Sequence, residues 1–250
     1  MKRRGRRGFI AFGLAVAVLP LAAAAQQMTG STMHVVQQPY NVESWGEFRK
    51  MMMTGDFTPK VRLGEVMAKH PTTGVGAVAD ARGEISIFDG KLIVSYGKPG
   101  PQPDAISDSA ALLAVASADN WQTVTVDRDV PPADVESYIA AAAKGHGVDA
   151  EKSFPFQARG SLVSYMMHVN AAATGGPHGM GLPMAVTVVS QGDRQDGQVA
   201  GLYVSRDLMG VATHGGERTH AHWISPDGIS TAHLDQWGLK SGTTLLLPRP

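Results

Sequence analysis

Three of the nine histidines lie within fourteen residues of one another, at His220, His222 and His233. If His220 and His222 lie on a strand, their side chains share one face, because alternate residues of a strand point the same way. The segment 225–228 (Ser-Pro-Asp-Gly) has the composition of a tight turn, with proline second and glycine fourth. The spacing therefore predicts a β-hairpin that carries all three imidazoles.

The register of this hairpin decides whether the three rings meet. With a two-residue turn at 226–227, His220 lies directly opposite His233, on the same side as His222. A shift by one residue, as in a three-residue turn with a bulge, would place Ala221 opposite His233 and separate the rings. We predict the register that brings them together.

Three converging imidazoles are the ligand set of a catalytic zinc site, which keeps a further position open for water or substrate. The chain has no cysteine, so imidazole and carboxylate are the ligands that it offers a transition metal. Asp235 and Glu217 lie close in sequence and are candidate acceptors for ring N–H groups. The alternative is a hairpin that is merely rich in surface or core histidines. The shared face of three rings favours the metal site.

The other six histidines divide into two groups. Three lie in expected loops or helix ends and are predicted to face solvent: His34, His70 and His146. The other three adjoin strands or a glycine-rich loop and are candidates to border a cleft: His168, His178 and His214. Their spacing alone does not place them.

The first 25 residues have the pattern of an export signal. A basic head is followed by an apolar core at 9–21, which is too short for a comfortable membrane span, and by Ala23-Ala24-Ala25 as a cleavage site. Arg6-Arg7 also resembles a twin-arginine signal, although a Sec signal fits nearly as well. We expect cleavage after Ala25, a mature chain of residues 26–250, and a periplasmic or secreted bacterial protein.

The charge balance excludes two classes of partner. Five of the 22 basic residues lie in the signal, so the mature part has 17 basic and 22 acidic groups. This balance argues against nucleic acid and against an anionic membrane surface. A small molecule is the partner that we expect.

Periodicity predicts an α+β fold with more strand than helix. A capping-box pattern at 44–47 opens a short helix that ends at 54–55, a second short helix ends before Pro71, and a third runs from 131 to 145. Asp89-Gly90 between alternating apolar runs predicts a hairpin over 84–94. Segment 110–118 fits strand or helix. Further strands are expected over 121–126, 156–168, 184–189, 199–204 and 208–213.

These residues resemble those of the α-acetolactate decarboxylase family. The family holds zinc with a His-x-His pair and a third histidine after ten intervening residues, a pattern that His220, His222 and His233 match. The sequences around these ligands are also similar, as are three segments of the first half of the chain. Those segments are 62–67, 74–76 and 82–91.

The resemblance implies two similar mixed β-sheet halves with short helices, packed into one compact unit and divided near residue 150 (26–150 and 151–250). It implies that zinc, or another divalent transition metal, is held by the three histidines and decarboxylates 2-acetolactate to acetoin. Loss of carbon dioxide leaves an enediolate, whose charge a Lewis-acidic metal stabilises. Family members are often dimers, an assembly that this sequence neither supports nor excludes.

The resemblance assigns Glu84 as the group that delivers a proton near the metal, and it reveals two departures. His168 occupies the position of the family arginine that holds the substrate carboxylate, with Arg159 as an alternative holder. The family's glutamate near the C-terminus has no counterpart in the seventeen residues after His233. A periplasmic protein that binds a small hydroxy-oxo acid without decarboxylating acetolactate, or an enzyme for a different substrate, is therefore the alternative.

Overall fold

The computed structural model describes residues 34–98, 101–171 and 186–250. The expected export signal and His178 lie outside these residues. No helix in the described ranges is long and apolar enough to cross a membrane.

Seven of the described strands form one sheet, here called sheet A, in the order β1-β2-β7-β4-β5-β6, with β3 paired to β7. Two short helices, α1 (Phe48–Thr54) and α2 (Leu63–Met67), and two 3-10 turns, η1 (Ala79–Ala81) and η2 (Ala105–Ser107), connect its strands. The strands are β1 (His34–Gln37), β2 (Val42–Trp45), β3 (Val61–Arg62), β4 (Thr73–Val78), β5 (Gly83–Phe88), β6 (Lys91–Tyr96) and β7 (Ser109–Ala116).

The other six described strands form sheet B, in the order β10-β11-β12-β9-β13-β8. An added pairing of β10 with β9 closes four of these strands into a ring. Helix α3 (Val135–Gly145) and the turns η3 (Pro132–Asp134) and η4 (Arg206–Leu208) belong to this part of the chain. The strands are β8 (Trp121–Thr125), β9 (Phe154–Ala171), β10 (Val186–Tyr203), β11 (Thr219–Ile224), β12 (Thr231–Leu239) and β13 (Thr244–Pro248).

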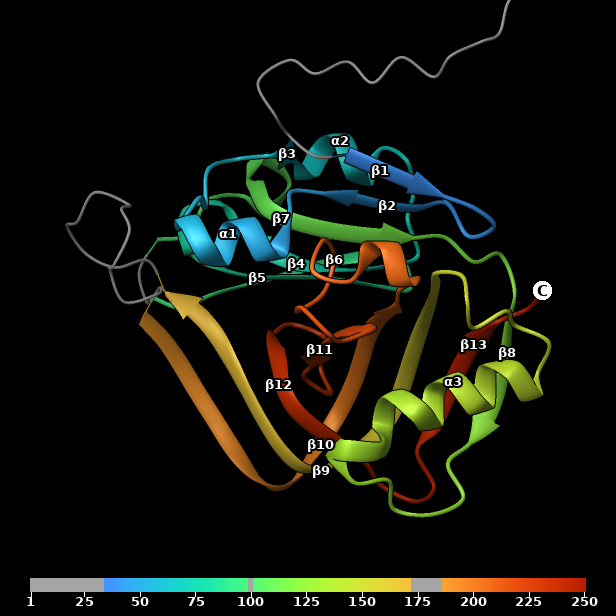
Figure 1. Ribbon diagram of the computed structural model, residues 1–250. Coiled ribbons are helices and arrows are strands. Elements are labelled where there is room, and N and C mark those ends of the chain that lie inside the picture. The colour runs from blue at the N-terminus through green and yellow to red at the C-terminus, as the bar shows by residue number, and fades with distance from the viewer. Residues whose placement is uncertain (1–33, 99–100, 172–185) are drawn as a thin grey trace, which may run out of the picture. The chain divides into compact units, whose positions relative to one another are not determined.

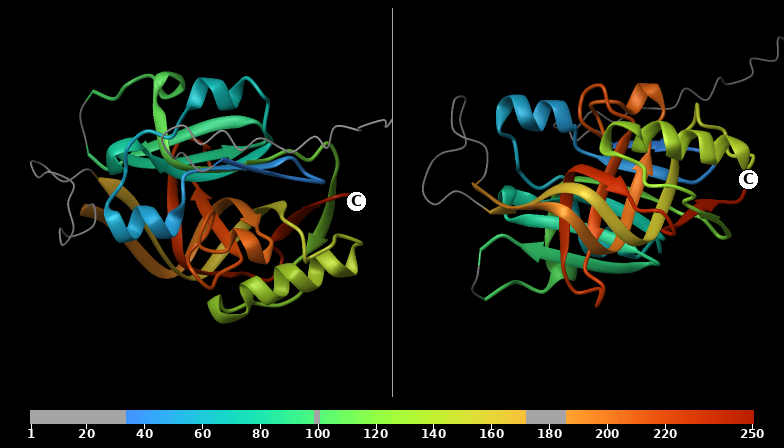
Figure 2. Two further views of the ribbon diagram at one scale, coloured as in Figure 1. Left: turned by 45° about the horizontal axis from the view of Figure 1, so that its top comes forward. Right: turned by 90° about the horizontal axis from the view of Figure 1, so that it is seen from below.

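The two sheets pack face to face (Figure 1). Their shared core joins Val42, Val75 and Ala114 of sheet A to Leu202 and Ile224 of sheet B. Helix α3 covers the other face of sheet B, where Ile139 packs in the same cluster as residues of β9, β12 and β13 (Figure 2). The expected α+β unit of two sheet-based halves is confirmed, and each strand pairing in the described residues is antiparallel.

The change from sheet A to sheet B falls between β7 and β8, earlier than the expected division near residue 150. Strand β8 pairs with β13, close to the end of the chain, and α3 packs on sheet B. The second half of the fold therefore begins near residue 121.

Strand β5 shows how sheet A contributes to the space between the sheets. All six of its residues are buried. Ile85 and Ile87 pack with Leu63 and Val66 of α2, so the alternate residues, Glu84 among them, point toward sheet B. The hairpin from β5 to β6 turns at Asp89 and Gly90, whose φ angles of 49° and 75° are left-handed, as the Asp-Gly pattern predicts.

Two local predictions were wrong. The first helix begins at Phe48, because Ser44 and Trp45 pair with β7 as part of β2, and Glu47 caps the helix without a side-chain bond. The strand expected over 208–213 is a turn after η4: the carbonyls of Gly210 and Val211 accept hydrogen bonds from the first turn of α1.

The longer strands are largely as expected. Residues 110–116 of the segment 110–118 are strand, in β7. The described residues 186–189 and residues 199–203, expected as two strands, belong to one continuous strand, β10.

Candidate metal centre

The histidine hairpin forms, but in a different register from the predicted one. His222, not His220, lies opposite His233. The turn closes at the predicted residues, where Gly228 N donates to Ser225 O, yet the loop continues to Ile229 because Ser225 Oγ accepts from the next two backbone N–H groups. Since the register moves by two residues, side-chain parity is preserved and the rings still share a face.

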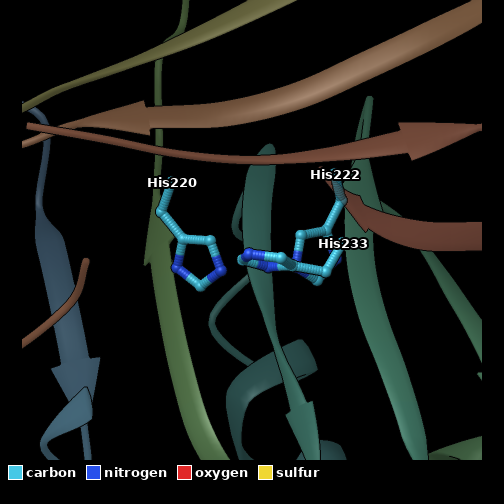
Figure 3. A group of neighbouring side chains, drawn as sticks. All are labelled: His220, His222 and His233. Carbon is cyan, nitrogen blue, oxygen red and sulfur yellow. The ribbon is translucent and has the colours of Figure 1, made fainter. Parts of the chain in front are cut away.

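The three histidines converge in the space between the sheets (Figure 3). One ring nitrogen from each of His220, His222 and His233 lies within 4.8 Å of the others, and all three residues are buried. His222 Nε2 is 3.3 Å from His233 Nδ1. Two nitrogens bound at roughly 2.0–2.1 Å to a tetrahedral zinc are separated by about this distance. The donor set therefore fits a divalent transition metal.

Neighbouring groups orient each ring. His220 donates its Nδ1–H to Ala212 O at 2.8 Å, which leaves the lone pair on Nε2. His222 Nδ1 lies 3.3 Å from Ser86 Oγ of sheet A, and His233 Nε2 lies 3.4 Å from His214 Nε2. Such contacts at the outer nitrogen fix the ring and the tautomer that a metal ligand needs.

Burial keeps these rings neutral. It lowers the pKa of His220 to about 4 and the pKa values of His222 and His233 well below the usual range. Neutral imidazole is the form that binds a metal. The cluster is therefore ready to coordinate a cation at neutral pH without first losing protons.

Glu84 approaches the cluster from sheet A. Its side chain is 2 % exposed, with Oε2 3.8 Å from His222 Nε2. Asn170 of β9 donates to Glu84 Oε1 through both its backbone N–H (3.1 Å) and its side-chain amide (2.6 Å). Burial raises the pKa of Glu84 to about 8 despite these hydrogen bonds. The raised pKa favours the protonated form of this carboxyl group at neutral pH, beside the histidine cluster.

His168 completes a row of histidines across sheet B, because it pairs with His233, which in turn pairs with His222. Asp235 accepts a hydrogen bond from His168 Nδ1 at 2.8 Å, and His168 Nε2 lies 3.9 Å from Glu84 Oε1. Burial lowers the pKa of His168, but its hydrogen bond to Asp235 is the foremost of the interactions that raise the pKa above its usual value. His168 therefore presents an N–H donor next to the three converging histidines.

Arg159, the alternative holder of a carboxylate, lies elsewhere. It pairs with Asp89 and covers the ring of Phe88 on a partly exposed surface. The histidines expected to face solvent, His34, His70 and His146, are exposed. Asp235 contacts His168 rather than a ligand histidine.

A cavity of about 270 Å³ adjoins the cluster. Its lining includes His220, His233, Glu84 and His168, all named from the sequence, together with His214 and Asn170. Sequence reasoning left His214 unplaced and missed Asn170, which lies beyond the expected end of its strand. Asp235 and Gly76 also line it, and apolar side chains form the rest of the wall: Phe48, Met51, Met52, Phe57, Ala77, Leu112, Met166 and Val189.

No protein-family model matches the chain, and no curated protein matches its sequence. Solved structures do match its fold. α-Acetolactate decarboxylase from Bacillus subtilis strain 168 has a TM-score of 0.63 at 16 % identity, over 82 % of this chain and 84 % of that one. The acetolactate decarboxylase from Bacillus subtilis subspecies spizizenii scores 0.62 at 14 % identity over the same shares.

A Staphylococcus aureus protein of unknown function, described as similar to α-acetolactate decarboxylase, scores 0.58 at 12 % identity. It matches over 81 % of this chain and 82 % of its own. The resemblance expected from the sequence is thus confirmed for the fold: the chain has the α-acetolactate decarboxylase fold.

Proposed function

We propose that the protein is a metal-dependent carboxy-lyase that converts 2-acetolactate to acetoin and carbon dioxide. One observation carries the proposal: the three buried histidines converge beside Glu84 in a cavity of the α-acetolactate decarboxylase fold. Zinc is the metal we expect, because three imidazoles are a common ligand set for catalytic zinc.

His220, His222 and His233 would hold the metal. When bound, it supplies a Lewis acid for the substrate's carbonyl and hydroxyl oxygens and stabilises the charge left as carbon dioxide departs. The neutral rings and the contacts at their outer nitrogens support this role.

Glu84 would supply the proton. Decarboxylation breaks the bond between the carboxylate carbon and its neighbour, and the electron pair remains on the part of the substrate that becomes acetoin. A new C–H bond must replace the broken bond, so one proton is consumed per turnover. Glu84 is protonated at neutral pH, is shielded from bulk water, and is held by Asn170 with Oε2 directed to His222. These properties suit a general acid.

His168 would bind the substrate carboxylate. Asp235 holds its Nδ1, so Nε2–H is the donor that faces the cavity side of the ring, near Glu84. A protonated imidazole makes one charged hydrogen bond here, whereas a guanidinium makes two parallel ones. We therefore expect weaker binding of acetolactate than an arginine would give.

A metal-site protein that binds a small hydroxy-oxo acid without turnover is the second candidate. The absence of Lys and Arg among the described residues that line the cavity favours it. The two candidates differ in acetoin release alone, since both require the metal.

The deciding experiment uses the purified mature protein and a His220→Ala variant. Bound metal is measured by atomic emission, and acetoin is measured after addition of 2-acetolactate. Stoichiometric metal with acetoin release, both lost in the variant, is the expected result. Metal without acetoin would select the second candidate, and a chain that binds no metal would contradict both.

A further inference from the structure

The cavity wall away from the histidines is apolar and comes from several elements. Met51 and Met52 of α1 contribute to it, as do Phe57 and Leu112. Helix α1 is fastened to the metal site, because the ring of Phe48 contacts that of His214, with 4.1 Å between ring centres. The backbone N–H groups of the first turn of α1 donate to the loop that carries His214. This apolar wall therefore has a fixed position relative to the metal ligands.

The ionisable groups around the cavity offer few partners for a substrate carboxylate. The ionisable groups in its described lining are four histidines and two carboxyl groups: His168, His214, His220, His233, Glu84 and Asp235. Nδ1 of His168 is already hydrogen-bonded to Asp235. Nε2–H of His168 is the donor left for a substrate carboxylate, in place of a guanidinium fork, so contact with the apolar wall must contribute a larger share of the binding energy.

The size of the cavity points the same way. Its volume of about 270 Å³ equals that of about nine water molecules in the liquid, at roughly 30 Å³ each. Acetolactate has nine non-hydrogen atoms, and bonded atoms each occupy less space than a water molecule. The small substrate would therefore leave part of the apolar wall without contacts, which forfeits dispersion energy.

On the basis of the proposed function, we propose that the preferred substrate is a larger homologue of acetolactate. This substrate is a 2-hydroxy-3-oxo acid whose substituent is an alkyl chain of three or more carbons or an aryl ring. The metal-binding and acid groups act on the same hydroxy-oxo core, while the substituent packs on Met51, Met52 and Leu112. Methionine suits this role because its flexible thioether adapts to ligands of different shape.

Two adjacent methionines provide a matched pair of variants. Met52 lines the cavity, whereas Met53 is 73 % exposed. Met52→Trp fills the space that a long substituent would occupy, and Met53→Trp adds the same side chain to the surface of the same helix. A tryptophan at either position makes the same change in composition, so a difference between the two variants reports on the cavity.

The test measures kcat/KM for 2-hydroxy-3-oxo acids with methyl, propyl, pentyl and phenyl substituents at the carbon that carries the carboxylate. We expect kcat/KM to rise about fourfold for each added methylene, the equivalent of about 0.8 kcal/mol, until the cavity is full. Met52→Trp should lower the preference for pentyl over methyl by about tenfold or more, and Met53→Trp should leave it unchanged.

Turnover of acetolactate at least as fast as that of its longer homologues would overturn the inference and leave the proposed function intact. A preference that is equal in the two tryptophan variants would also overturn the role assigned to Met52. Loaded metal without turnover of any member of the series would instead contradict the proposed reaction, so the two failures are distinguishable.

Discussion

His222 of β11 and His233 of β12 lie directly opposite each other, with Nε2 of the first 3.3 Å from Nδ1 of the second. Both rings are buried, and the described lining of the cavity contains no lysine or arginine. His220, two residues before His222 on the same strand face, supplies the third nitrogen. The hairpin alone thus carries all three histidines of the proposed metal site.

Replacement of His222 by alanine removes a proposed metal ligand whose side chain is fully buried. We expect loss of tightly bound metal, measured by atomic emission after gel filtration. The thermal stabilisation that metal gives the wild type, on the order of 4 kcal/mol when free metal is a thousandfold above its Kd, should disappear as well. His34→Ala is the control, because His34 is exposed on β1 and contacts Glu43. Retention of metal by the His222 variant would contradict the assigned ligands.

Replacement of Glu84 by glutamine preserves shape and the oxygen that accepts from Asn170, but removes the acidic proton. We expect kcat for decarboxylation to fall by about 10²–10⁴-fold, the usual contribution of a general acid, while metal content stays the same. Turnover is followed by acetoin release and metal by atomic emission. A kcat within a few fold of wild type would show that the proton comes from elsewhere.

Replacement of His168 by arginine restores a two-pronged donor beside Asp235. A charged bidentate contact with the substrate carboxylate should raise kcat/KM for acetolactate by about tenfold or more, chiefly through KM, since hydrogen bonds to charged groups contribute about 1.5–3 kcal/mol. His168→Gln, which retains a neutral donor, should instead lower kcat/KM. The proposed carboxylate contact is wrong if the two variants change KM alike.

Stability of the metal-free protein should depend on pH through the ligand histidines. The pKa of His220 is lowered from 6.5 to about 4, so below pH 6.5 the unfolded chain binds protons that the folded chain does not bind. The contribution of these neutral histidines to the free energy of unfolding is fully present above pH 6.5 and is lost as pH falls toward 4. At pH 5.5 the loss is on the order of 1 kcal/mol per histidine.

Two neighbouring groups act in the opposite direction. The pKa of Glu84 is raised to about 8 and the pKa of His168 is raised as well, so the folded state holds these protons more tightly and gains stability as pH falls. The Glu84→Gln substitution removes the effect of Glu84, which is the larger of the two. In chelator-treated protein of this variant, the free energy of unfolding in urea should be lower at pH 5.5 than at pH 7.5. Adding His220→Gln to the same variant should make this difference smaller. An unfolding free energy that does not change with pH would contradict neutral, buried ligand histidines.

The common face of the ligand histidines could be predicted from the sequence, because side-chain parity depends only on spacing along a strand. The register could not, because it depends on Ser225, whose hydroxyl binds the N–H groups of Ile229 and Ser230 and lengthens the loop. Turn residues alone do not reveal this side-chain contact. The convergence of the three rings was correctly predicted, because the register differs from the expected one by an even number of residues.

Glu84 illustrates the limit of local patterns. Its hairpin alternates like a half-exposed strand, yet α2 covers one face and sheet B the other, so its side chain is buried. Only resemblance to a family pointed to it. The apolar residues Leu208 and Ala212 likewise suggest a strand, but they pack into the core from a turn whose carbonyls bind α1 and His220. Contacts between distant segments decide both cases.

The three histidines belong to sheet B and Glu84 to sheet A. A metal ion would crosslink only the neighbouring strands β11 and β12, whereas a substrate between the metal and Glu84 touches both sheets. A substrate bound in the cavity therefore links the two halves of the fold. Amide protons of β5 and β11 should then exchange with solvent more slowly when a substrate analogue is bound than with metal alone, since a ligand that spans two sheets suppresses their separation.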